Sequence, residues 1–141
     1  MNPALNDQLL KAIFQEDLAL AKQYIQAGAE VNYVSGKQDT ALLIAVDTMN
    51  DELVSFLLAQ GANPNPDPAA VYTLPFNLAV DVAVQAVLNE EAATLSNATI
   101  ELLLRHGADF TVKDQSGKNA VEMATNYNSA AHQLFEARLN S

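Results

Sequence analysis

The chain has 141 residues, half of them hydrophobic, and a formal net charge of -10. This length suits a single domain, and the absence of cysteine excludes disulfides, thiolate metal sites and thiol catalysis. The few basic residues are scattered, so a binding surface for nucleic acid or for an anionic membrane is not expected. The acidity either keeps the protein soluble or favours basic partners.

The stretch from Met1 to Asn6 lacks the basic head and the apolar run of a signal peptide. No later apolar run is long enough to span a membrane. We therefore expect a cytoplasmic protein.

Residues 6–32 are predicted to form a first pair of helices, separated by a turn near Glu16 and Asp17. The stretch 7–12 opens with Asp7, whose side chain can cap a helix N-terminus. Gly28 can adopt the left-handed conformation that ends the second helix. The second helix is polar for a buried element, as expected of the N-terminal cap of a stack.

Residues 33–65 repeat this arrangement. The stretch 40–45 opens with Thr40 and has alanine in its sixth place, as the stretch 7–12 does. The interval from Gly28 to Gly61 falls in the range of periods that indicates stacked supersecondary units. Three prolines over 64–68 then make a stiff connection, which we do not interpret as a domain boundary because the next helix start follows closely.

Residues 66–110 contain a longer third unit. Pro75 suits the first turn of a helix and Thr73 is expected to cap it, while Gly107 ends the second helix. The interval between the two helices, 79–100, is longer than its counterpart in the second unit, 45–54, by a 12-residue insertion. We expect the first helix to run on to Leu88 and residues 83–97 to form a helical insertion. This insertion is either a tolerated surface elaboration or an element that extends a binding surface.

Residues 111–141 form the last unit, which lacks the closing Gly-Ala pair. Its end alternates polar and apolar residues at helical spacing, with His132 and Arg138 among the polar ones. This pattern is typical of the C-terminal cap of a stack. A stack closed on both sides is not expected to be a fragment of a longer array. We also expect a monomer.

At these residues the chain resembles the ankyrin repeat family. The Thr-Pro-Leu-His-x-Ala phrase of the family is matched in part by Thr40, Leu42 and Ala45, and again by Pro75 and Ala79, although the histidine is absent. The family's Leu-Leu-x-x-Gly-Ala-Asp ending is matched over 57–65 and 102–109, and its Asp-x-x-Gly turn over 113–119. The turns at 35–39 and 66–72 depart from the pattern and are expected to differ in shape.

The resemblance implies an all-α fold: an ankyrin-type solenoid of four helix-turn-helix repeats joined by β-turn loops, with the 12-residue insertion in the third. The repeats are residues 6–32, 33–65, 66–110 and 111–141 of one domain, 1–141. It also implies a non-catalytic module for protein–protein interaction.

No catalytic or cofactor constellation is evident in the sequence. His106 and His132 are far apart in the chain and lack the carboxylate spacing of a metal site. The glycines end helices and form no phosphate-binding loop. We therefore predict no cofactor and no metal, and an enzyme whose site is assembled from distant residues is the alternative.

The resemblance places a partner protein on the concave side, against the turn tips and the exposed face of each first helix. Asp47 and Asp81 fall on equivalent sites, with Phe14 at one rim and Tyr127 at the other, which suits a basic segment with apolar anchors. The predicted turn contacts are Gly36, Lys37, Asp39, Ala70, Val71, Thr73, Gln115, Ser116 and Lys118, and the predicted helix contacts are Phe14, Gln15, Asp47, Thr48, Asp81, Val82, Asn126 and Tyr127. The alternatives are binding mainly through the insertion 83–97 and an ordinary solvated face without a partner.

Overall fold

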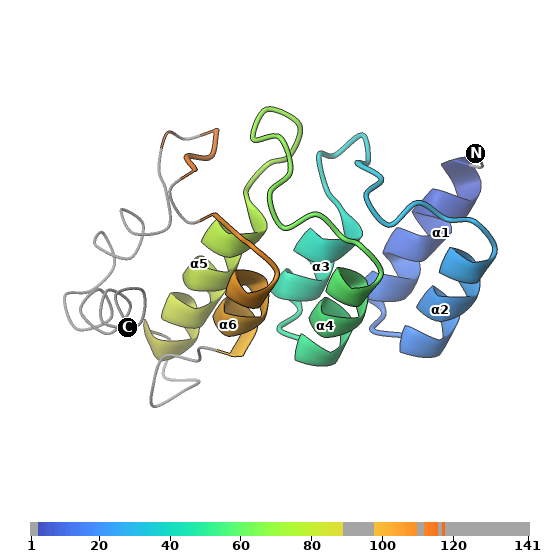
Figure 1. The fold of residues 1–141 in the computed structure, drawn as a ribbon, viewed down its shortest axis with the longest axis horizontal. Helices are drawn as coiled ribbons and strands as arrows, with labels where there is room; N and C mark the ends of the chain where they lie inside the picture. The colour runs from blue at the N-terminus through green and yellow to red at the C-terminus, as the bar shows by residue number, and fades with distance from the viewer. Residues whose placement is uncertain (1–2, 89–97, 110–111, 116, 118–141) are drawn as a thin grey trace.

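A computed structural model describes residues 3–88, 98–109, 112–115 and 117. In these residues the chain forms six α-helices and no strand (Figure 1). The helices pack as pairs: α1 (Pro3–Phe14) with α2 (Leu18–Gln26), α3 (Ala41–Asp47) with α4 (Asp51–Ala59), and α5 (Pro75–Leu88) with α6 (Ala98–Arg105). The predicted all-helical class is confirmed. Most of the predicted fourth repeat lies outside the described residues.

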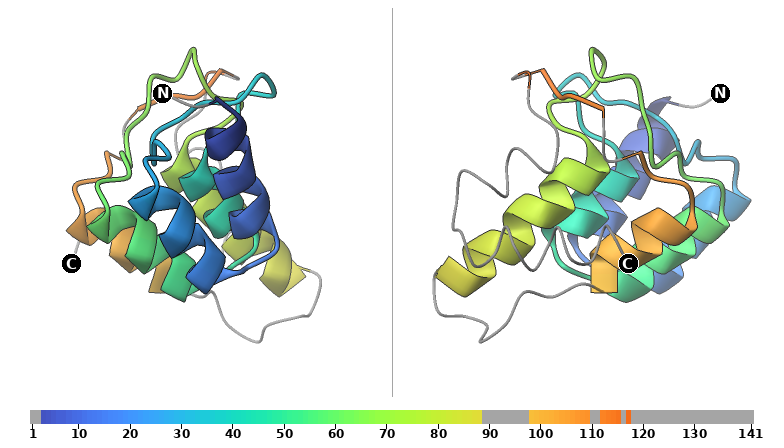
Figure 2. Two further views of the ribbon diagram at one scale, coloured as in Figure 1. Left: turned by 90° about the vertical axis from the view of Figure 1, so that its right-hand side faces the viewer. Right: turned by 60° about the vertical axis from the view of Figure 1, so that its left-hand side comes forward.

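The pairs stand side by side in chain order, with their helices in two rows (Figures 1 and 2). Contacts join α1 to α3 and α3 to α5 in the first row, and α4 to α6 in the second. The loops that lead into α3 and α5 project from one end of the helices (Figure 1); we call them the tip loops, residues 33–40 and 66–74. None of the helices in the described part is both long and apolar enough to cross a membrane.

The core lies between the two rows of helices. Its largest fully buried side chains include Leu9, Ile13, Leu43, Leu57 and Phe76, and burying each such side chain stabilises the fold by roughly 1.5–3 kcal/mol. The alanines that recur in the sixth place of each helix-start stretch, Ala12, Ala45 and Ala79, are also buried. A small side chain at this position allows the neighbouring helices to approach closely.

The three predicted helix-ending glycines all have positive φ, 109° at Gly28, 93° at Gly61 and 88° at Gly107. After each glycine, the amide of the next alanine donates back across the last turn, from Ala29 to Tyr24, Ala62 to Leu57 and Ala108 to Leu103, each at 2.9 Å. These bonds satisfy carbonyls that a helix end leaves without partners. The glycines therefore occupy the same place after α2, α4 and α6, as predicted.

The helix starts agree with the sequence in part. Thr40 caps α3, its hydroxyl accepting from the Leu43 amide at 3.2 Å, and Pro75 is the first residue of α5. The prediction for Thr73 is wrong in position: the Leu74 carbonyl accepts the first helical bond, from Leu78, so Leu74 is the N-cap residue.

The predicted cap at Asp7 is also wrong. α1 already begins at Pro3, so Asp7 lies within the helix and not at its N-terminus. Asp7 instead accepts a hydrogen bond from the Tyr33 hydroxyl at 3.1 Å. This bond raises the pKa of Tyr33.

At each step of the stack, one asparagine side chain joins the loop after one helix pair to the loop after the next pair. Asn32 accepts from the Asn63 amide at 2.7 Å and donates to the Gly61 carbonyl at 3.1 Å. Asn65, at the equivalent place in the next unit, accepts from the Asp109 amide at 2.7 Å and donates to the Gly107 carbonyl at 2.8 Å. The same two bonds thus recur at both steps of the stack.

The first tip loop keeps the turn that its sequence was expected to lose. The Gln38 amide donates to the Ser35 carbonyl at 2.9 Å, as the Gly117 amide does to the Asp114 carbonyl. Gln38 takes the place of the missing glycine with a φ of 62°. The expectation of a different shape is therefore wrong for residues 35–39, since a non-glycine residue adopts the left-handed conformation at some conformational cost.

Candidate functional site

The first row of helices presents the predicted helix contacts at the surface to different degrees. Phe14, the last residue of α1, is 70% exposed, and Asp47, the last residue of α3, is exposed as well. Gln15 is exposed, whereas Thr48, Asp81 and Val82 are half-buried. Phe14 and Asp47 occupy equivalent ends of neighbouring helices, so they stand in one row across the stack.

The tip loops place one predicted contact inside the core. Lys37 is exposed and Asp39 and Thr73 are half-buried, but Val71 is fully buried. Its assignment to the exposed contact surface is therefore wrong. The neighbouring Tyr72 is 45% exposed. The sequence pattern therefore did not distinguish the buried Val71 from the exposed Tyr72 in this loop.

Gln115 joins the tip loops to each other. Its side-chain nitrogen donates to the Val71 carbonyl at 2.7 Å and also lies within hydrogen-bond distance of the Ala69 carbonyl and the Gln38 side-chain oxygen. The Tyr72 amide donates to the Gln38 carbonyl at 3.1 Å. These bonds fix the second tip loop against the first. Of the other predicted contacts, Gly36 is exposed and Ala70 half-buried, while Ser116, Lys118, Asn126, Tyr127 and residues 89–97 of the insertion lie outside the described residues.

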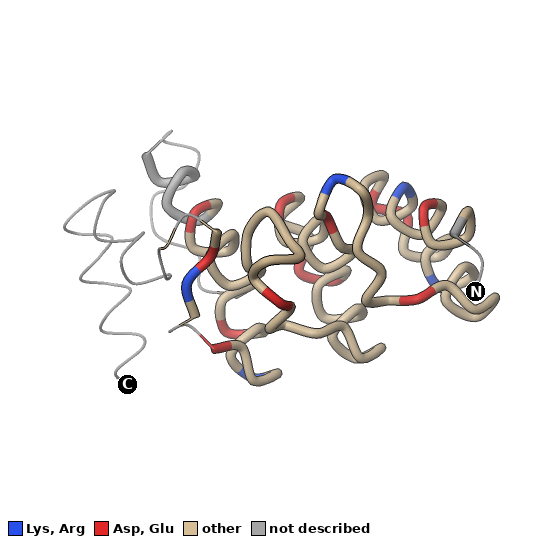
Figure 3. The backbone as a smooth tube through the Cα atoms, turned by 90° about the horizontal axis from the view of Figure 1, so that it is seen from above, with Lys and Arg blue, Asp and Glu red and all other residues tan. Residues whose placement is uncertain are grey.

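Acidic groups gather where the first tip loop meets α3. Burial raises the pKa of Asp39, and the charge of Asp47 adds to this effect, while a hydrogen bond from the Thr40 amide opposes it. Burial, together with the charges of Asp39 and Asp47, raises the pKa of Tyr72 to about 12. Figure 3 shows acidic residues recurring along the described part of the chain, with basic residues fewer between them. The field near Tyr72 is therefore negative.

A groove of about 500 Å³ lies between α1 and the first tip loop. Leu10, Phe14 and Ile44 supply its apolar lining. Its charged residues are Asp7, Lys11, Lys37 and Asp39. We call this groove, together with the adjoining Asp47 and Tyr72, the α1–α3 face.

Sequence reasoning missed six members of the α1–α3 face: Asp7, Leu10, Lys11, Ser35, Ile44 and Tyr72. Among them, Leu10 and Ile44 are apolar but only half-buried, because they line the groove beside the first tip loop, whose position helical periodicity does not predict. Tyr72 was passed over for its buried neighbour Val71.

The described residues contain no group of three or more histidine, cysteine, aspartate or glutamate side chains that could hold a metal ion. His106 has the place that the sequence indicated, beside the C-terminus of α6. Its Nδ1 lies 2.9 Å from the Leu102 carbonyl oxygen, one turn back. An N–H at this ring position can donate to a carbonyl of the helix C-terminus, where donors and positive charge are favoured.

The helical fold agrees with the comparison to known families. A model of the ankyrin repeat matches residues 37–67, which include the end of the first tip loop, the whole of α3 and α4, and the loop that follows. This segment is an ankyrin repeat, as the sequence predicted. A repeat of this family suggests a protein–protein interaction module and is typically non-catalytic.

Proposed function

We propose that the protein is a non-catalytic binding module, an adaptor, inhibitor or regulator, that holds a partner protein on the concave face of a four-repeat ankyrin solenoid. The repeats are those predicted from the sequence, with the 12-residue insertion in the third, and they form one domain over 1–141. The module acts as a cytoplasmic monomer, and its partner offers a basic segment.

The observation that carries this proposal is the α1–α3 face. It combines an exposed aromatic ring, Phe14, with an exposed carboxylate, Asp47, at equivalent ends of neighbouring helices. Aromatic side chains and buried apolar pockets are the usual energetic centres of protein interfaces. Complementary charge gives such an interface its selectivity.

The test is a selection of binding peptides from a random peptide library displayed on a surface, with the full chain as bait. We expect the enriched peptides to contain lysine or arginine. Replacement of the two equivalent acids, Asp47→Lys with Asp81→Lys, is expected to weaken binding of these peptides by at least about tenfold, because like charges replace opposite ones.

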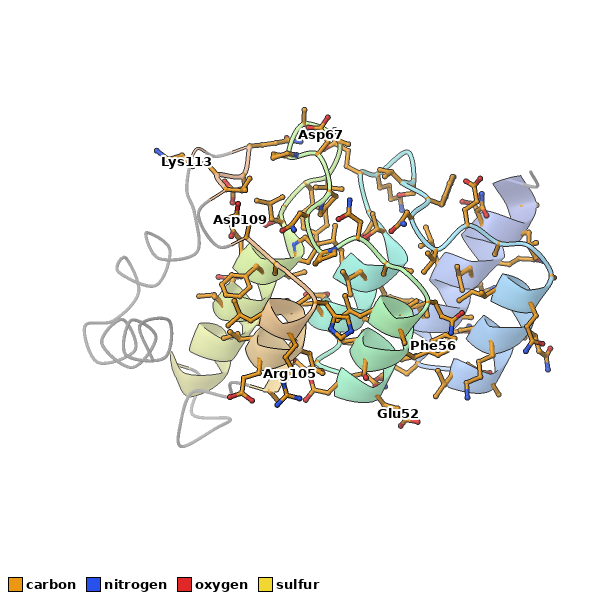
Figure 4. All side chains as sticks on the ribbon, in the orientation of Figure 1. Glu52, Phe56, Asp67, Arg105, Asp109 and Lys113 are labelled. Atoms are coloured by element: carbon orange, nitrogen blue, oxygen red, sulfur yellow. The ribbon has the colours of Figure 1, made fainter. Side chains whose placement is uncertain are left out.

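The matched control is Glu30→Lys with Glu52→Lys, which changes the net charge by the same amount at two residues that do not line the groove. Figure 4 shows Glu52 on α4, at the end of the helices opposite to the tip loop that contains Asp67. Both control residues are exposed. Equal loss of binding in the control and test variants, or no loss in either, contradicts the proposal; circular dichroism verifies that both variants are folded.

A second candidate binding element is the insertion 83–97. α5 has 14 residues, whereas α3 has 7, so the helix that leads into the insertion extends further than its equivalent. Deleting residues 89–97 separates the two candidates. Loss of library-peptide binding in the deletion variant, with retention in the Asp47→Lys and Asp81→Lys variant, favours the insertion.

A further inference from the structure

The groove of the α1–α3 face is suited to an apolar side chain. Its lining includes Leu10, Phe14 and Ile44, and Phe14 exposes 70% of its surface. The four charged residues at the groove are two acids and two bases, Asp7 and Asp39 with Lys11 and Lys37. Their charges balance, so the groove itself offers apolar contact and little selection by charge.

The group that can select a charged partner lies on the next helix of the first row, α3. Asp47 occupies on α3 the position that Phe14 occupies on α1, and its charge contributes to the raised pKa of the exposed Tyr72. A carboxylate beside an exposed aromatic ring favours a cation, through a charge-assisted hydrogen bond and through contact with the ring face. Arginine suits this combination better than lysine, because its planar group can do both at once.

The distance between Phe14 at the groove and Asp47 on α3 limits the conformation of a peptide segment that contacts both. Packed helices have axes about 8–10 Å apart, so we expect the backbones at Phe14 and Asp47, at equivalent ends of the contacting helices α1 and α3, to be about one such step apart. A polyproline II segment returns to the same face every three residues, after about 9.3 Å. In a strand, residues three apart point to opposite sides. In a helix the matching spacing is seven residues, about 10.5 Å.

We propose that the α1–α3 face takes an extended, polyproline II-like segment of the partner, with an apolar side chain in the groove and an arginine three positions away against Asp47 and Tyr72. This inference rests on the proposed function and specifies the register of its partner. The apolar side chain of the partner binds in the groove, and the arginine of the partner binds at Asp47.

The test uses synthetic peptides with one leucine and one arginine on a background of proline, alanine and glutamine, titrated against the full chain by fluorescence anisotropy. The spacings compared are two, three and seven positions, each in both orders of leucine and arginine. We expect a three-position peptide in one of the two orders to bind at least about tenfold more tightly than either two-position peptide. Tightest binding at seven positions makes the occupant a helix and overturns the proposal.

Two pairs of variants locate the peptide. Phe14→Ala is expected to weaken binding of the three-position peptide by about tenfold, whereas Met49→Ala, which removes another exposed apolar side chain, leaves it unchanged. Asp47→Asn is expected to weaken binding of the arginine peptide but not of its glutamine counterpart, and Glu52→Gln to weaken neither. Equal effects of Asp47→Asn on both peptides overturn the proposal.

Two further outcomes separate this inference from the function on which it rests. If no designed peptide binds while library peptides bind and respond to charge reversal, the register is wrong and the proposed function stands. If the protein alone forms dimers in sedimentation experiments and Phe14→Ala abolishes them, the occupant of the groove is a second copy of this chain, and the proposal is overturned.

Discussion

Single residues between the helices of a pair adopt a conformation that favours glycine. Glu16 and Met49, at equivalent places in successive pairs, have φ of 58° and 59°. In both places the next amide donates across the last turn, Asp17 to Ala12 and Asn50 to Ala45. The geometry is the one that Gly28, Gly61 and Gly107 provide at the other end of each pair, but here a side chain adds steric cost.

Met49→Gly is expected to stabilise the protein by about 1 kcal/mol, because it removes the strain of a non-glycine residue at positive φ. Met49 is 47% exposed, so little packing is lost. Chemical denaturation measures the effect. Met49→Ala is the control, since it shortens the side chain but keeps the Cβ; an equal gain in both variants contradicts the strain.

Asp39 is expected to make stability depend on pH. Burial raises its folded-state pKa above the ordinary value of 3.8, so the folded chain holds this proton more tightly than the unfolded chain. Asp39 therefore contributes fully to the free energy of unfolding below pH 3.8. This contribution is lost as the pH rises through the raised pKa of the folded chain. Asp47, Tyr72 and Lys37 are the neighbouring titratable groups.

Asp39→Asn is thus expected to raise the melting temperature at pH 7 and to lose this advantage near pH 4. The asparagine oxygen can still accept from the Thr40 amide, as Asp39 does at 3.0 Å, so the local turn is preserved. A direct measurement is an NMR titration of the Asp39 carboxyl carbon. A midpoint at or below 3.8 would falsify the expectation.

At the scale of elements, the asparagine bridges hold successive pairs in register. Asn32→Ala removes two hydrogen bonds between loops, and about 1–3 kcal/mol of stability is expected to be lost, since each bond contributes about 0.5–1.5 kcal/mol. Asn32→Asp keeps the acceptor for the Asn63 amide and loses only the donor to Gly61, so its loss should be smaller. Urea denaturation ranks the variants, with the exposed Gln60→Ala as the neutral control; an Asn32→Asp variant as unstable as Asn32→Ala contradicts this division.

The sequence predicted the features that depend on local interactions and missed those that depend on contacts between distant segments. Gly28, Gly61 and Gly107 were predictable because a helix end is set by backbone conformation within a few residues. The extension of α5 to Leu88 was predictable because no helix breaker interrupts it. The burial of Val71 and the exposure of Tyr72 were not, because both depend on how the second tip loop packs. The role of Asn32 was hidden for the same reason, since its partners lie a whole repeat away in the chain.

At the scale of the whole molecule, one structural rule produces both stability and surface. Each helix pair packs on the next, and the recurring alanines, glycines and asparagines repeat the same contacts at each step. Such a stack extends in one direction, so equivalent residues on successive helices form rows at the surface. In this chain the row that begins with Phe14 continues with Asp47. A substitution at one position of this row therefore changes the surface of one helix pair and leaves the surfaces of the other pairs unchanged.

The net charge of -10 predicts opposite salt effects on folding and on binding. Self-repulsion among acidic residues destabilises the compact chain, so raising sodium chloride from about 0.02 M to about 0.3 M, which shortens the Debye length severalfold, is expected to raise the melting temperature. The same screening is expected to weaken binding of arginine-containing peptides to the α1–α3 face, because attraction to Asp47 is reduced. Thermal melts and anisotropy titrations in matched buffers measure the two trends. Peptide affinity that is constant or rises with salt contradicts an electrostatic contribution from this face, whereas a melting temperature that falls with salt contradicts self-repulsion.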